Sequence, residues 1–182
     1  MNKNKDVEKI VFAAILTSMA LVIKIMFFYI PLPTVIKNVD IFIIFIVFSG
    51  ILLGPMFGGF VGIAVDLIYL LVVGGDWGFF TLAHFSAGFI PGVFFLFLKY
   101  DWKKLIIVLL ITLSVYFTIT LYALYFYYGW VINVETVSIR LPRYFVTFII
   151  SLFAIHFLVT DARLQTFAIY KHFNKKNGKT IA

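Results

Sequence analysis

The chain has 182 residues, of which 63% are hydrophobic and only 13% are charged, and its formal net charge is +7. Soluble domains are about half apolar and about a quarter charged, so this composition excludes a water-soluble globular protein. At about 20 residues per span, the chain has room for five to seven membrane-spanning helices but none for a nucleotide-hydrolysing domain. We expect one transmembrane domain over residues 1–182 that needs partners for any energy-driven step.

Cysteine is missing from the sequence, which excludes disulfides, thiolate chemistry and cysteine-ligated metals. The sequence also lacks a phosphate-binding glycine loop, a His-Glu-x-x-His motif, a Gly-x-Ser-x-Gly motif and clustered carboxylates. We therefore expect no enzyme activity, no cofactor and no metal. The positions of the basic residues point to membrane lipid rather than to nucleic acid.

Six apolar stretches predict an all-α bundle of six transmembrane helices. Glycine, proline or charged residues separate them, each a stop or turn signal. The second stretch is short for a helix that crosses a bilayer, unless residues 35–40 extend it. In chain order the predicted helices run over 7–30, 41–53, 56–73, 79–98, 105–128 and 144–160.

The basic residues predict the orientation of the bundle. They cluster before residue 10, over 99–104 and after residue 160. Cytoplasmic loops carry an excess of Lys and Arg, so we expect both termini in the cytoplasm, with a basic tail over 171–182. The protein would then be a multi-pass protein of a cell membrane. An external ligand would meet it at the outer segments 31–40, 74–78 and 129–143.

Ionisable groups inside the apolar stretches are expensive in a bilayer, and each is a candidate functional residue. Asp66 lies too deep in its stretch to reach the interface; it either lines a ligand site or bonds a neighbouring helix. His84 presents the same two alternatives, ligand contact or an interhelical hydrogen bond. Lys24 lies in the outer half of the first stretch, and we expect it to reach toward the outer interface.

Arg140 and Arg143 stand on the expected outer side, against the usual charge bias. A guanidinium can bind a carboxylate through two parallel N–H donors, so either arginine could meet an anionic ligand. The alternative is pairing with lipid phosphate or Glu135. Nearby, Trp77, Phe79 and Phe80 crowd a glycine-rich loop; they could stack on a flat heterocycle or simply form an interfacial aromatic belt.

Small residues give the first stretch a smooth face that could dock another membrane subunit. They are Ala13, Ala14, Thr17, Ser18 and Ala20. Glycines at four-residue spacing, Gly54, Gly58 and Gly62, then Gly88 and Gly92, are expected to serve helix packing within the chain.

Longer motifs resemble a known family. Gly50-Ile-Leu-Leu-Gly-Pro-Met-Phe-Gly-Gly-Phe-Val-Gly-Ile-Ala-Val-Asp66-Leu is followed by Phe80-Thr81-Leu82 and Gly88-Phe-Ile-Pro-Gly92. With six helices and a small-residue first helix, these stretches resemble the substrate-binding (S) components of energy-coupling factor (ECF) vitamin transporters, most closely the folate-type group. Three features depart from the pattern. Gly78-Phe79 precedes Phe-Thr-Leu where Pro-Gly is usual, and Ser18 replaces the second alanine of an Ala-x-x-x-Ala pair. His84 is not associated with the group.

The resemblance implies a bacterial vitamin binder with no chemistry of its own. It would work with a transmembrane coupling subunit, met by the small-residue face, and with two cytoplasmic ATPases, as part of an ABC importer. Transport would occur by reorientation of the binder in the membrane. In a folate site, Trp77 or Phe80 would stack on the pterin, Asp66 would face its amino-pyrimidine edge, and Arg143 would bind the glutamate tail. Thr81, beside Phe80, belongs to the same implied site.

Other readings remain open at this point. Relatives of the folate-type group resemble binders of pantothenate or a B6 vitamer. An intramembrane enzyme using Asp66 or His84 as an acid or base, and a purely structural subunit of a larger complex, are the alternatives from other functional classes.

Overall fold

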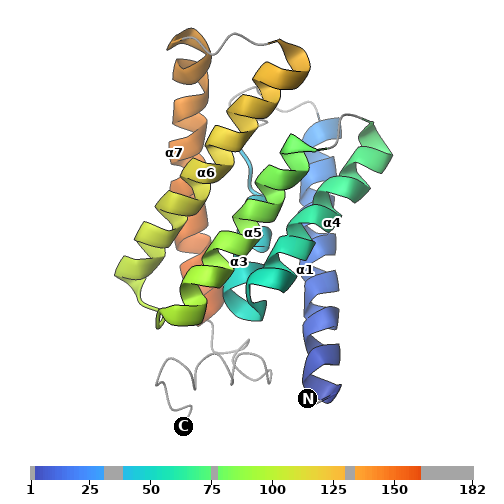
Figure 1. Ribbon diagram of the computed structural model, residues 1–182, viewed down its shortest axis with the longest axis vertical. Coiled ribbons are helices and arrows are strands. Elements are labelled where there is room, and N and C mark those ends of the chain that lie inside the picture. The colour runs from blue at the N-terminus through green and yellow to red at the C-terminus, as the bar shows by residue number, and fades with distance from the viewer. Residues whose placement is uncertain (1–2, 31–38, 75–77, 130–133, 161–182) are drawn as a thin grey trace.

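The computed structural model describes residues 3–30, 39–74, 78–129 and 134–160, and the regular secondary structure in these ranges is α-helical. The all-α bundle of six helices predicted from the sequence is confirmed. Figure 1 shows the helices running up and down along one common direction. They are α1 (Lys3–Tyr29), α3 (Ile43–Leu53), α4 (Pro55–Val73), α5 (Phe79–Phe97), α6 (Trp102–Tyr128) and α7 (Val134–Thr160).

Five of the described helices are long and apolar enough to cross a membrane, and α3 is the exception. Its 11 residues rise about 16 Å, roughly half of a hydrocarbon core of about 30 Å. Val39 and Asp40 are not helical and do not extend it. The shortness noted from the sequence is therefore confirmed, and the prediction that this stretch is a transmembrane helix is corrected to a short buried helix. Protein rather than lipid surrounds it, because α1, α4, α5 and α7 all contact it and only Phe45 is not buried.

The last helix also differs from the prediction. We expected it to begin at Tyr144, because Pro142 and two arginines resemble a loop, but α7 begins at Val134 with Pro142 inside it. A proline near the start of a membrane helix is tolerated where neighbouring groups satisfy the freed backbone. Arg140 and Arg143 therefore lie on a helix, three residues apart, and project from one face of it.

Glycines bring three helices into backbone contact at the centre. A Cβ on Gly50 of α3 would collide with the carbonyl oxygen of Gly88 on α5, and a Cβ on Gly88 would collide with that of Gly58 on α4. The packing role predicted from the glycine spacing is thus confirmed for Gly58, Gly62, Gly88 and Gly92. It is not confirmed for Gly54, because nothing lies within 4 Å of its Cβ position. Gly54, with φ of +98°, makes the turn from α3 to α4, where Pro55 occupies the first turn of the new helix.

The start of α1 and the end of α7 lie at the same end of the bundle (Figure 1). This arrangement agrees with an even number of chain crossings. Which side of the membrane this end faces stays a prediction from the basic residues. The predicted tail over 171–182 lies outside the described residues.

Candidate functional site

A cavity of about 470 Å³ lies in the half of the bundle farthest from the start of α1. It is formed by the C-terminal halves of α1, α4 and α6, the N-terminal halves of α5 and α7, and the chain entering α3. Its volume falls within the range of small-molecule binding pockets. Its wall combines aromatic rings, Phe27, Phe28, Phe42, Tyr69, Phe80 and Tyr116, with ionisable side chains, Lys24, Asp40, Asp66, His84, Arg140 and Arg143.

One wall of the cavity holds a buried cluster of polar groups from three helices. Lys24 Nζ of α1 donates to Asp66 Oδ1 of α4 at 2.8 Å and lies 3.2 Å from His84 Nε2 of α5. His84 Nδ1 lies 2.6 Å from the carbonyl oxygen of Phe80, so it donates there and leaves the Nε2 lone pair for the ammonium. Thr81 donates to the other Asp66 oxygen at 2.7 Å. The expectation that Lys24 reaches the outer interface is therefore wrong.

The close approach of α4 and α5 at Gly62 allows the polar groups of this cluster to meet. Gly62 lies four residues before Asp66, on the same face of α4, and a Cβ there would collide with the backbone carbonyl of His84. The missing side chain lets α5 approach α4 closely at this level. The short Asp66 side chain therefore reaches both Thr81 and the ammonium that also contacts His84.

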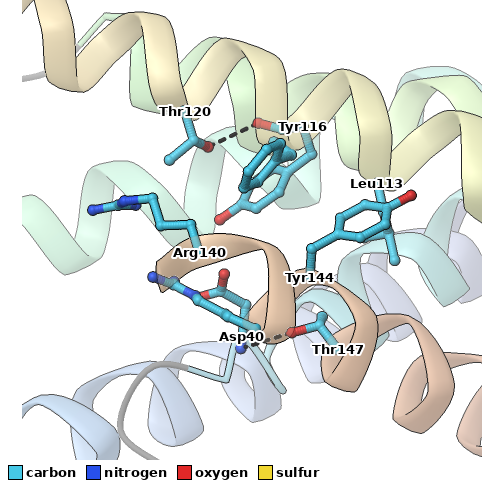
Figure 2. Close-up of a pocket in the computed structure, with 9 residues that line it drawn as sticks. Asp40, Leu113, Tyr116, Thr120, Arg140, Tyr144 and Thr147 are labelled. Carbon is cyan, nitrogen blue, oxygen red and sulfur yellow. Dashed lines mark hydrogen bonds and ion pairs between the residues drawn. The ribbon is translucent and has the colours of Figure 1, made fainter. Parts of the chain in front are cut away.

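The opposite wall holds a second ion pair. Arg143 Nη2 of α7 lies 2.5 Å from Asp40 Oδ1, ahead of α3, and Thr147 accepts a bond from the Asp40 backbone N–H at 3.4 Å. A smaller pocket of about 30 Å³ adjoins this pair between α6 and α7. In Figure 2 the side chains of Tyr116 and Arg140, from α6 and α7, lie beside one another near Asp40.

The structure brings together most of the residues singled out from the sequence. Asp66, Phe80, His84, Arg140 and Arg143 all line the one cavity.

Of the other three candidates, Thr81 and Phe79 do not line the cavity. Thr81 stands behind Asp66 as its hydrogen-bond donor. Phe79 packs edge-on against Tyr122 and Phe126 of α6, and among the described residues it is not part of the cavity wall. Trp77 lies outside the described residues.

The small residues of α1 divide between two faces. Ala20 is buried and Ala13 packs against the core, whereas Ala14 and Ser18 are exposed. Thr17 and Ser18 bond the carbonyl oxygens of Ala13 and Ala14 at 2.8 and 2.9 Å, so their hydroxyls are satisfied within the helix. A smooth outward strip therefore remains at Ala14 and Ser18.

Sequence reasoning missed several residues of the wall: Lys24, Asp40, Phe42, Tyr69 and Tyr116. A signal existed for Lys24, because it continues the inward face of Ala13, Leu16 and Ala20 at helical spacing. Tyr69 and Tyr116 carried no such signal among the 10 tyrosines of the chain.

The arrangement can hold a small molecule between rings and charged groups. Among the described residues, no cluster of three or more His, Asp or Glu side chains could bind a metal ion.

Comparison with known proteins identifies the family. The model of the ECF transporter substrate-specific component family matches residues 8–160, which include all the helices that form the cavity. No curated protein and no solved structure matches the chain significantly. Since the match covers most of the chain, the protein belongs to the substrate-specific components of ECF transporters.

Proposed function

We propose that the cavity binds a vitamin with a flat ring and a carboxylate, and that folate is the first candidate. The observation that carries the proposal is the composition of the wall: aromatic rings surround the cavity, a hydrogen-bonding cluster lies on one side and two arginines lie on the other. Ligand pockets typically combine apolar walls with a few placed polar groups of this kind.

The part of the wall formed by α7 can bind a carboxylate through its two arginines. Arg140 and Arg143 project from one face of α7 into the cavity, and a guanidinium fork can donate two parallel bonds to the two oxygens of a carboxylate. A ring would lie between this wall and α5, where Phe80 lines the cavity and stacks on Tyr127 with ring planes 19° apart.

Asp66 is the group expected to face the amino-pyrimidine edge of a pterin. It already accepts bonds from Lys24 and Thr81, although each carboxylate oxygen can accept a second one. Because Asp66 already has these two partners, the alternative is a vitamin that does not need to bond its carboxylate, namely pantothenate or a B6 vitamer.

We further propose that the chain hands its vitamin to a coupling subunit and two ATPases by reorienting in the membrane. Support comes from the family, whose members are substrate-specific components of transporters, and from the exposed strip of Ala14 and Ser18 on α1, which permits close helix contact.

The test is a titration of purified protein in lipid nanodiscs with folate, pantothenate, pyridoxine, thiamin, riboflavin and biotin. We expect stoichiometric binding of folate. Binding of none of the six would contradict the proposal, and tighter binding of pantothenate or pyridoxine would favour the alternative.

A double variant tests the arginine wall. Asp40→Asn with Arg143→Gln removes both charges of the ion pair together, so neither is left buried alone. Loss of charge-assisted hydrogen bonds to a ligand carboxylate amounts to about 1.5–3 kcal/mol, which is about 10- to 150-fold in affinity. Folate should weaken by this factor, whereas pyridoxine, which has no carboxylate, provides the comparison. Unchanged folate affinity would contradict the role given to Arg143.

A further inference from the structure

We infer that the cavity contains a ready-made site for an organic cation, that the ammonium of Lys24 fills this site from within the chain, and that Lys24 thereby restricts the cavity to neutral and anionic ligands.

The surroundings of the Lys24 ammonium carry the inference. A carboxylate oxygen of Asp66 lies 2.8 Å from Nζ, and the ring centroids of Tyr69 and Phe42 lie 4.3 and 5.0 Å from it. His84 Nε2 adds a lone pair at 3.2 Å. Proteins recognise organic ammonium ligands with this combination of aromatic faces and negative charge. Here the cation is supplied by a side chain.

Lys24 is held as a ligand would be. Its side chain is only 11% exposed, although a lysine near a helix end usually extends its charge to the interface. It comes from α1, while the four groups around its ammonium come from α4, α5 and the residue preceding α3. The site is therefore built by the rest of the bundle, and α1 delivers the cation to it.

The charge arrangement explains the effect on specificity. Both carboxylates of the described wall are paired with basic side chains, Asp66 with Lys24 and Asp40 with Arg143. A cationic ligand would have to displace one of these partners or lie beside it in a medium of low dielectric constant, and like charges held close together there are strongly disfavoured. A neutral or anionic ligand meets no such penalty.

The inference rests on the proposed function only in taking the cavity as the ligand site. The cation site itself depends on the contacts of Lys24, and its test uses no vitamin.

The test is chemical rescue. Lys24→Ala removes three methylene groups and the ammonium, whose non-hydrogen atoms are those of propylammonium. Leaving Asp66 buried without its partner should lower the melting temperature by about 10 °C. Propylammonium chloride should restore about half of that loss or more by binding the folded state. Sodium chloride or 1-propanol at the same concentration should not.

Two proteins serve as controls. The wild type has its site filled and should not respond. Lys9→Ala removes the same side chain from the same helix, where the ammonium lies 5.9 Å from the Phe57 ring at the opposite end of α1. It should show no rescue. Equal stabilisation of all three proteins, or no specific stabilisation of Lys24→Ala, would overturn the inference.

A second variant covers the case in which Lys24→Ala does not fold. Lys24→Gln keeps a hydrogen-bond donor near Asp66 and most of the side-chain volume, but it leaves the carboxylate without a cation. The smaller methylammonium ion should then stabilise this variant more than the wild type, and an equal effect on both would overturn the inference. Failure of every vitamin to bind would refute the proposed function and leave these results standing.

Discussion

Substituting Gly62 by alanine should damage both the stability of the bundle and the ligand site. The new Cβ would overlap the backbone carbonyl group of His84, lying 2.6 Å from its carbon and 3.1 Å from the nitrogen of Phe85. These are backbone atoms of α5, which cannot rotate away as a side chain can. The helices α4 and α5 must therefore separate at the level of the cavity.

The required separation follows from these distances. Ordinary contact begins at about 3.4 Å, so the 2.6 Å approach to the carbonyl carbon alone demands a shift of about 0.8 Å, and the closer overlap with the carbonyl oxygen demands more. Overpacking of this kind costs about 1–3 kcal/mol. For a chain of this size the melting temperature should fall by about 2–12 °C. The same shift would stretch the contact between His84 Nε2 and Lys24 Nζ, now 3.2 Å, beyond hydrogen-bonding length.

The matched control is Gly59→Ala, one turn earlier on α4. Its Cβ would also meet α5, at 2.5 Å, but the atom it meets is Cε2 of the Phe85 ring, which can turn aside. Thermal unfolding and ligand titration in nanodiscs should show a clear loss for Gly62→Ala and a smaller one for Gly59→Ala. Equal effects of the two substitutions would refute the reasoning.

Two further substitutions probe the two ends of the bundle. Thr81→Val removes the 2.7 Å hydrogen bond to Asp66 Oδ2 and should lower the melting temperature by about 2–6 °C. The control Thr81→Ser keeps the hydroxyl and should retain the stability. An unchanged melting temperature of the valine variant would argue against the bond. At the other end, burial raises the pKa of the Tyr100 hydroxyl, which therefore stays protonated and bonds His156 Nδ1 at 3.1 Å. Tyr100→Phe should leave vitamin affinity in a calorimetric titration unchanged, and a loss of affinity would count against the proposed cavity.

The helices were largely predictable because the chain marks their ends with glycine and proline. Gly54 followed by Pro55, for example, stops α3 and starts α4 as expected. The shortness of α3 was visible in the sequence, but its burial among other helices was not, since an apolar run has the same pattern whether lipid or protein surrounds it. The predicted start of α7 was wrong for a different reason. Pro142 is typical of a loop, but it lies inside α7.

Some residues of the cavity wall could be predicted because a charged side chain in or near a bilayer is energetically costly. Asp66 stands out because a charge in an apolar stretch needs a partner or water. Arg143 stands out because a basic residue on the expected outer side runs against the usual charge bias. The identity of each partner could not be read from the sequence, because Lys24 and Asp66 are 42 positions apart and Asp40 and Arg143 are 103 apart. Only the inward face of α1 hinted that Lys24 points into the bundle.

The shortness of α3 has a consequence for how this protein makes room for a guest. The cavity lies at the N-terminal end of α3, where Val39, Asp40 and Phe42, which precede the helix, line it. Two or three more helical turns at that place would fill the space with side chains, while the five long helices could keep their positions. The cavity therefore exists because one central helix is short. A longer or shorter α3 would change the volume of the cavity without changing the spacing of the helices around it.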